Sequence, residues 1–132
     1  MILVDTSVWI DYFAGINSAH CTHLKTAITN SEDLCICGII MTEVLQGIRK
    51  DKDFDKVHQI LDNLIYLPDH QSSYLAAAKM YRSLRKKGRT IRTPIDCIIA
   101  AFCIEHSAFL LHNDRDFEFI AEVFPLQRYE GA

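Results

Sequence analysis

The sequence of 132 residues lacks an apolar stretch that could cross a membrane as a helix. Its longest run without a charged side chain, Tyr12 to Leu24, has 13 residues and contains polar ones such as Asn17 and His20, whereas a membrane-spanning helix needs about 20 apolar residues. A secretory signal is also absent, because Met1-Ile2-Leu3-Val4 has no basic region and is followed directly by Asp5. We therefore expect a protein that acts in the cytoplasm.

Cysteine motifs typical of metal sites and redox centres are lacking. The five cysteines are an odd number, none of them forms a C-x-x-C pair, and none lies beside a histidine at the spacing of zinc ligands. Four of the five lie in apolar segments, and the set is Cys21, Cys35, Cys37, Cys97 and Cys103. This usage predicts reduced, buried thiols in a cytoplasmic protein rather than disulfides or a zinc site.

Linkers, internal repeats and low-complexity segments are absent as well. Hydrophobic residues make up 49% and charged residues 23% of the chain, which are ordinary values for a globular protein and exclude disorder, collagen and coiled-coil arrays. At about 150 residues per domain, the length favours a single domain. We expect residues 1–132 to form that domain.

Short apolar runs alternate with segments of helical periodicity along the chain. The runs predict strands at Met1–Val4, Leu34–Cys37, Leu64–Leu67, Phe109–Leu111 and Leu126–Tyr129. The periodic segments predict helices between the start signal Asp5-Thr6-Ser7 and Gly15, and over 18–30, 40–48, 54–64, 72–87, 93–106 and 114–123. This alternation is typical of an α/β fold whose mostly parallel sheet is covered by helices on both faces.

Acidic residues follow the predicted strands closely. The five that stand near strand ends or in the helices beside them are Asp5, Glu43, Asp96, Asp114 and Asp116. In open parallel sheets, ligands bind beyond the carboxyl ends of the strands. Carboxylate oxygens are the ligands that Mg²⁺ takes from proteins, so the pattern predicts a divalent-cation site at this edge.

Each of these acids also has a purely structural explanation. Asp5 and Asp114 are good helix N-caps, and Thr93-x-x-Asp96 resembles a capping box with Asp in place of Glu. Glu43, taken alone, is most simply a solvated helix residue. Capping does not require that the acids converge on one edge of one sheet, and this convergence favours the metal site.

A basic segment stands apart from these acids. No acidic residue lies between Asp69 and Asp96, although the formal net charge is −3. Arginines recur there at helical spacing and lead toward Asp96, and with the arginine inside the last acidic motif they are Arg82, Arg85, Arg89, Arg92 and Arg115. We expect these side chains to contact the phosphates of a nucleic acid. The alternative is a solvated surface whose basic end suits a helix C-terminus.

Four short motifs in fixed order resemble the PIN-domain pattern, and more closely that of the VapC toxins of bacterial toxin–antitoxin pairs. They are Val4-Asp5-Thr6-Ser7, Met41-Thr42-Glu43-Val44, the segment from Thr93 to Ala101 and the segment from Leu110 to Phe117. The resemblance covers essentially the whole chain. It implies a three-layer PIN-like fold and a Mg²⁺- or Mn²⁺-dependent endoribonuclease that cleaves transfer or ribosomal RNA, inhibits translation and is silenced by a cognate VapB-like antitoxin. It also implies a homodimer.

The resemblance assigns roles to the five acids. Asp5, Asp96 and Asp114 match the metal-binding acids of the family. Glu43 matches an acid that acts in catalysis or supports the metal ligands, and Asp116 matches the extra acid of the last motif. These five are therefore the expected catalytic residues.

Several points stay open at this stage. His112 stands where many family members carry threonine, and Ser7 can either contact the scissile phosphate or cap a helix. A catalytically silent PIN scaffold that binds RNA or protein is one alternative function. A Mg²⁺-binding receiver-like signalling domain is another, but it would need paired acids after the first strand and a lysine after a late one. Asp5 stands alone, and no lysine follows Leu111.

Overall fold

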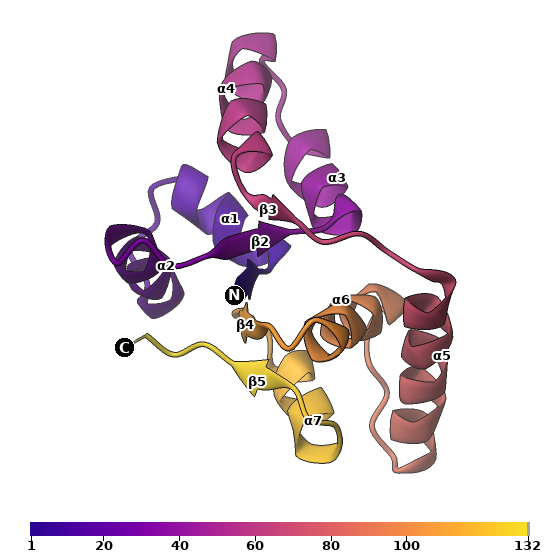
Figure 1. Cartoon of the computed structure of the whole chain (residues 1–132). Helices are drawn as coiled ribbons and strands as arrows, with labels where there is room; N and C mark the ends of the chain where they lie inside the picture. Colours follow the sequence, from indigo (N-terminus) through magenta and orange to yellow (C-terminus); the bar gives the residue numbers. More distant parts are fainter. Residues whose placement is uncertain (132) are drawn as a thin grey trace.

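A computed structural model describes residues 1–131 and shows five strands in one wholly parallel sheet (Figure 1). The strands are β1 (Ile2–Val4), β2 (Leu34–Ile36), β3 (Ile65–Tyr66), β4 (Phe109–Leu111) and β5 (Gln127–Arg128). Their order in the sheet is β3-β2-β1-β4-β5. The predicted α/β fold is confirmed, and the strands form within the predicted apolar runs.

Seven helices connect the strands within the described residues. They are α1 (Thr6–Phe13), α2 (Ala19–Thr29), α3 (Gly38–Gln46), α4 (Asp51–Asp62), α5 (Gln71–Lys86), α6 (Pro94–Glu105) and α7 (Arg115–Val123). Each predicted helix is present, with bounds shifted by a few residues. The largest shift is in α4, which begins at Asp51 rather than Phe54, because Asp51 and Asp53 occupy its first turn and favour a helix N-terminus.

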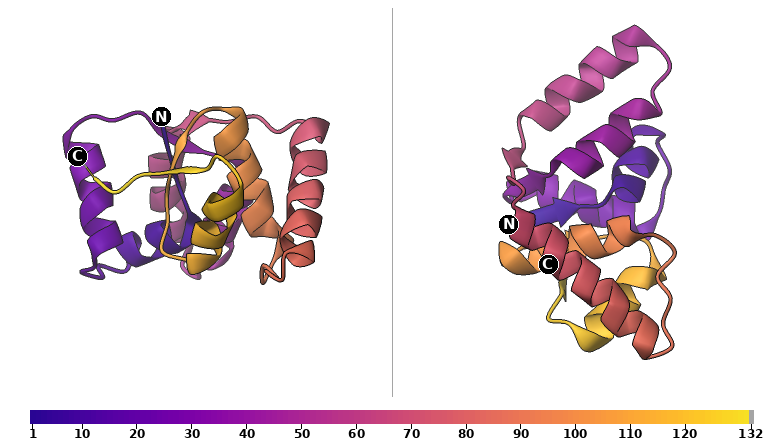
Figure 2. Two further views of the ribbon diagram at one scale, coloured as in Figure 1. Left: turned by 90° about the horizontal axis from the view of Figure 1, so that it is seen from below. Right: turned by 90° about the vertical axis from the view of Figure 1, so that its right-hand side faces the viewer.

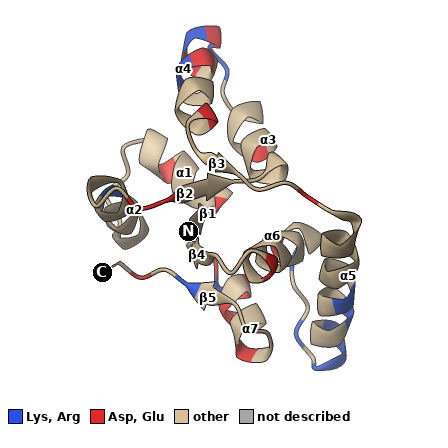
Figure 3. Cartoon of the chain, viewed as in Figure 1, with Lys and Arg blue, Asp and Glu red and all other residues tan. Residues whose placement is uncertain are grey.

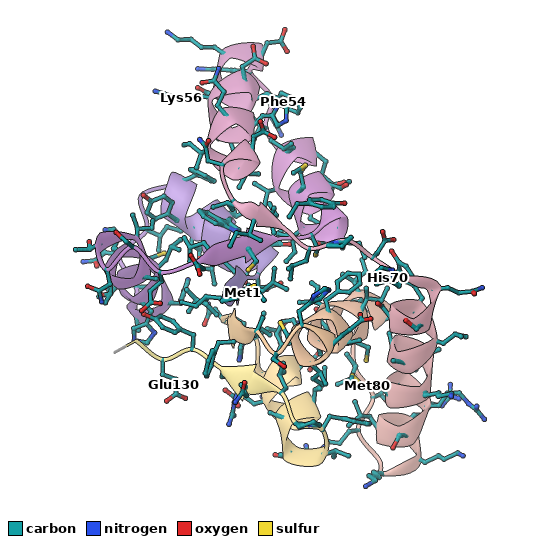
Figure 4. All side chains as sticks on the ribbon, in the orientation of Figure 1. Met1, Phe54, Lys56, His70, Met80 and Glu130 are labelled. Atoms are coloured by element: carbon teal, nitrogen blue, oxygen red, sulfur yellow. The ribbon has the colours of Figure 1, made fainter. Side chains whose placement is uncertain are left out.

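The helices form two layers around the sheet. Helices α1 to α4 lie on one side of the sheet and α5 to α7 lie on the other, as Figures 1 and 2 show. This division follows from the strand order, because parallel crossovers are right-handed and the chain changes direction across the sheet after β3. Helix α4, which carries Phe54 and Lys56, projects away from the sheet (Figure 4).

The core surrounds the central strand β1. Leu3 and Val4 are fully buried there, and Trp9, Phe102 and Phe117 pack around the strand from α1, α6 and α7. All five cysteines are buried and unpaired, as predicted. Within residues 1–131, no helix combines the length and apolar character that crossing a bilayer requires.

Candidate active site

The carboxyl ends of β1 and β4 meet at one edge of the sheet and bring two of the predicted acids together. Asp5 follows β1 directly, and its backbone N–H donates to the carbonyl of Leu111 at 2.9 Å, which extends the pairing of the two strands to the site. Asp114 comes shortly after β4, and Asp96 lies in the first turn of α6. The edge predicted from the strand pattern is therefore the edge at which these acids gather.

Three carboxylates form the tightest group. Asp96, Asp114 and Asp116 each offer an oxygen, and these three oxygens lie within 4.8 Å of one another. Asp96 and Asp116 are buried and Asp114 is half-buried. Hard cations such as Mg²⁺ take oxygen ligands in a small octahedral shell, so this donor set is consistent with a divalent metal ion. Asp116, expected as an extra acid, thus lies inside the group.

Asp5 and Glu43 stand beside this group, each held by a hydroxyl. Asp5 is 7% exposed, and its carboxylate accepts a hydrogen bond from the Ser7 hydroxyl at 3.0 Å. Asp5 occupies the N-cap position of α1, but its carboxylate accepts no backbone N–H of that helix among the described residues. Glu43 accepts from the Thr6 hydroxyl at 2.8 Å. No pattern in the sequence indicates this role of Thr6, because its partner lies 37 residues away.

The other two acids with a capping explanation differ from each other. Asp114 caps α7, because its Oδ1 accepts the N–H of Asp116 at 2.9 Å. At α6, the Thr93 hydroxyl accepts the N–H of Ile95 at 3.2 Å, but among the described residues the Asp96 carboxylate accepts no hydrogen bond from the Thr93 N–H. The capping box is therefore only half formed, and the carboxylate of Asp96 is free for another role.

Arg92 lies against the group of acids as its counter-ion. Its backbone N–H and its Nε both donate to Oδ2 of Asp116, at 3.2 and 3.3 Å, and its Nη2 pairs with Asp114. The side chain is nonetheless 73% exposed. The structure thus places an arginine expected to bind RNA on two of the acids, where it offsets part of their charge.

The remaining negative charge alters the acid–base chemistry of the site. Burial and the charges of Asp114, Asp5 and Asp116 raise the pKa of Asp96 to about 7. Burial, opposed by the Ser7 hydroxyl and reinforced by the charge of Glu43, raises the pKa of Asp5 to about 6. Carboxylates held together in a buried site favour protonation or a bound cation over the bare charged state.

His112 supports the site from outside the group of acids. Its Nδ1 accepts the N–H of Asp114 at 3.0 Å, and its ring lies 5.0 Å from that of Phe117. Burial lowers the pKa of His112 and favours the neutral ring that such a bond needs. A threonine hydroxyl can make the same local bond to the second residue after it, so histidine at this position preserves the turn that presents Asp114.

The predicted RNA-binding arginines fall into different environments. Arg82 and Arg85 are exposed on α5, toward the end of the helix where Figure 3 shows lysine and arginine gathered. Arg115 is also exposed, at the start of α7. Arg89 lies 4.1 Å above the ring of Phe119. Packing thus engages Arg89 and Arg92, while the other three remain available to a ligand.

Comparison with known proteins agrees with this geometry. The model of the PIN domain matches residues 2–123. The chain belongs to the PIN-domain family. Over 129 residues it is 34% identical to the ribonuclease VapC11 of Mycobacterium tuberculosis, covering 96% of both chains. This likeness confirms the predicted place of the chain among the VapC proteins of the PIN-domain family.

Solved structures show the same PIN fold. VapBC2 from Rickettsia felis, solved bound to a DNA fragment from its promoter, contains a chain with a TM-score of 0.73 and 20% identity, and 97% of each chain is covered. A toxin–antitoxin complex from Klebsiella pneumoniae has a TM-score of 0.63 and 23% identity, and the match covers 96% of this chain and 99% of that one. PIN-domain membership also excludes the receiver-like alternative.

The raised pKa values predict how stability depends on pH. A carboxyl whose folded pKa lies above its ordinary value of 3.8 adds to the free energy of unfolding at pH values below 3.8. For Asp96, this contribution is lost as the pH rises from 3.8 through its folded pKa of about 7. We expect the free energy of unfolding in EDTA to fall between pH 4 and pH 7, and Asp96→Asn to flatten the profile. Urea titrations across this range measure the effect. Asp62→Asn, at an exposed acid on α4, is the control; a mutant profile parallel to that of the wild type would contradict the assignment.

Arg92 gives a second prediction, because its guanidinium and a metal ion compete for the same oxygens. Arg92→Gln keeps the backbone bond to Asp116 and removes the charge. We expect Mg²⁺ to stabilise this variant at several-fold lower concentration than the wild type, measured as the rise in melting temperature with added Mg²⁺. Arg115→Gln, which removes an exposed charge from α7, should titrate like the wild type. Equal Mg²⁺ midpoints for both variants would show that Arg92 does not compete.

Proposed function

We propose that this protein is a Mg²⁺-dependent endoribonuclease toxin that cuts transfer or ribosomal RNA and so inhibits translation. The observation that carries the proposal is the group of carboxylate oxygens of Asp96, Asp114 and Asp116, within 4.8 Å of one another at the carboxyl edge of the sheet. The VapC ribonucleases that the chain resembles over nearly its whole length support the substrate class.

The donor set fits a hard cation, Mg²⁺ or Mn²⁺. Asp96 is the common ligand in this proposal, because the charges of Asp114, Asp116 and Asp5 all act on it. Asp114 and Asp5 would help to hold the same ion. Asp116 completes the site or receives a second ion with the substrate. The buried, mutually repelling carboxylates gain most from a cation that neutralises them.

The residues of the site then divide the work of phosphodiester hydrolysis. A divalent cation supplies an activated water and neutralises charge on the phosphate. Glu43, fixed by Thr6, is positioned to orient a water and accept its proton. Ser7 orients the carboxylate of Asp5. In this proposal water, and not a side chain, is the nucleophile, and the hydroxyls of Thr6 and Ser7 orient the carboxylates to which they donate.

The acids repel RNA, so other residues must attract it. Arg82 and Arg85 on α5 and Arg115 on α7 are exposed and contact phosphates in this proposal. Arg92 bridges the two regions, since it pairs with Asp114 and is largely exposed. It can turn toward a phosphate when a metal ion takes over the acids. Arg89 contributes less, because Phe119 and Glu122 hold its guanidinium.

The partners follow from the same family. Toxin–antitoxin complexes from Rickettsia felis and Klebsiella pneumoniae share the fold, and they support a cognate VapB-like antitoxin that silences this chain. A homodimer is the proposed assembly. The five buried, unpaired thiols support action in the cytoplasm, where the RNA substrates are. A silent scaffold is disfavoured, because every acid of the expected set is present and gathered at the site.

Loss of one acid should abolish cleavage while leaving the fold intact. Changes to groups that only support metal ligands lower metal affinity or activity by about 10–100-fold. We therefore expect Asp96→Asn, which changes a proposed ligand itself, to lower RNA cleavage in Mg²⁺ by about 100-fold or more. EDTA should do the same to the wild type. The exposed Asp62→Asn should cut normally. Cleavage is measured by mapping RNA ends after incubation with the purified protein.

The same variants report on the toxin role in cells. Induction of the wild type alone should arrest bacterial growth, whereas Asp96→Asn should not. Co-expression of the antitoxin encoded beside the gene should restore growth. Normal growth with folded wild-type protein present would contradict the toxin proposal. Cleavage by Asp96→Asn at the wild-type rate would contradict the proposed metal site.

The basic helix end makes a separate prediction about RNA affinity. Each phosphate contact to a single strand contributes about −0.7 to the slope of log affinity against log salt, so Arg82→Ala with Arg85→Ala should flatten the slope by about 1.4. Lys25→Ala with Lys52→Ala removes the same charge from exposed positions on α2 and α4 and should change it little. Filter binding at several salt concentrations gives both slopes. Equal slopes for the two double variants would move the RNA path away from α5.

A further inference from the structure

A hollow opens beside Glu43, and the other residues that line it have no part in the mechanism described above. It has a volume of about 470 Å³, and Glu43 and Ile95 line it on the side of the active site. The remaining walls come from α3, from the connection between β3 and α5, and from α5 and α6 (Figure 1). Small-molecule sites in proteins have volumes of about 300–1,000 Å³, so the hollow is large enough for one small, flat group.

Two tyrosines give this hollow exposed aromatic surface. Tyr66 on the edge strand β3 is 53% exposed, and Tyr74 on α5 is 39% exposed. The Tyr74 ring is fixed at two points: its hydroxyl donates to Asp69 at 2.6 Å, and the ring of Phe102 meets it edge-on at 6.1 Å. A rigid ring with an open face is suited to stacking with a flat partner.

Gly38 leaves room for the other ring. A Cβ atom at this position would lie 3.1 Å from the hydroxyl of Tyr66, so a larger side chain at the start of α3 would press on that ring. Two polar side chains of α3, Thr42 and Gln46, are exposed and complete the lining. The Gln46 amide can both donate and accept, and the Thr42 hydroxyl, which donates to the Gly38 carbonyl at 2.9 Å, keeps its acceptor capacity.

The aromatic surface continues toward the basic end of α5. Tyr74 also lines a second hollow of about 300 Å³ between α5 and α6, together with Tyr81 and Arg82. Arg85 lies 5.8 Å from the centroid of the Tyr81 ring. Aromatic rings interleaved with arginines are the pattern on which proteins bind single-stranded nucleic acid, with bases on the rings and phosphates on the arginines.

From this arrangement we infer that the hollow beside Glu43 is a nucleobase site, which takes an unpaired base of single-stranded RNA next to the phosphodiester that is cut. The base packs against both rings, Tyr66 and Tyr74, and Gln46 and Thr42 bond its edge. A base inside a duplex cannot enter, because its faces are already stacked and its edge is paired. The inference rests on the proposed function and adds to it the side chains that hold a base next to the cut.

Exposed tyrosines beside a hollow can also be the contact between two copies of the chain. The continuity of Tyr74 with Tyr81 and Arg82 favours RNA, because rings interleaved with arginines suit a single strand. The two occupants nevertheless predict different behaviour. If the tyrosines form a contact between copies, replacing them changes the oligomeric state. If they form a base site, replacing them changes the affinity for RNA that carries its bases.

The experiment measures binding of a short, fluorescein-labelled single-stranded oligoribonucleotide of mixed sequence in EDTA, so that no strand is cut. Stacking on one aromatic ring is worth about tenfold in affinity, so Tyr66→Ala and Tyr74→Ala should each weaken binding by about that factor, and Tyr66→Phe and Tyr74→Phe by about twofold at most. Leu75→Ala, at an exposed residue of α5 outside the hollow, is the matched control. Circular dichroism checks that every variant is folded.

A second set of probes replaces one base at a time by an abasic nucleotide. When the abasic nucleotide stands at the position that occupies the hollow, the strand should bind the wild type about tenfold more weakly than the intact strand does. The alanine variants should bind the abasic and the intact strand equally well. The affinity for the same strand in duplex form should not change when either tyrosine is replaced. Undetectable binding by the wild type, or equal losses with every probe, would overturn the inference. So would a shift to monomer on size-exclusion chromatography with unchanged RNA affinity.

The outcomes separate this inference from the proposed function. If the wild type cuts RNA in Mg²⁺ and the tyrosine variants bind every probe normally, the base site fails and the nuclease stands. If the wild type cuts no RNA but binding depends on the tyrosines and on one base, the nuclease fails and the base site stands.

Discussion

The repulsion among carboxylates at the carboxyl edge of the sheet is the constraint on which this structure depends. Asp5, Asp96, Asp114 and Asp116 come from three separate parts of the chain and meet where β1 and β4 end. Bringing them together costs free energy, because burial and like charge raise the pKa values of Asp5 and Asp96 to about 6 and about 7. A fold that needed only stability would separate these acids or replace them, so their convergence is a functional feature of the molecule.

The surrounding structure offsets this cost in ways that leave room for a metal ion. Arg92 covers Asp114 and Asp116 from the solvent side, and its exposed side chain can withdraw. Ser7 holds Asp5, and His112 fixes the turn that presents Asp114. None of these groups enters from the core, where a fixed positive charge would satisfy the acids permanently. The charge balance is therefore incomplete, and the group of carboxylates is consistent with a divalent cation.

Opposite charges are also divided across the molecule. The acids lie at the sheet edge, and the exposed arginines of α5 lie on the helix that packs against α6, which carries Asp96. The acids alone would repel a polyanion. In the proposed function, the arginines attract it at one surface and it is cut at another. The hollow beside Glu43 lies next to the cutting site, and Tyr74 links it to a second hollow that reaches Arg82 on α5. The proposed path of the RNA runs along these two hollows, which share Tyr74.

The sequence by itself determined the alternation of strands and helices, the buried thiols and the edge at which the acids meet, because periodicity and strand-end position are local properties. It also located the caps at Thr93 and Asp114. Only the tertiary structure decided that Asp116 joins the tightest group of oxygens and that Arg92 lies on the acids. The same holds for the bond between Thr6 and Glu43, 37 residues apart. Spacing along the chain sets only the relative directions of side chains within one helix, about 100° per residue. Which side chains of distant segments meet is set by the packing of those segments.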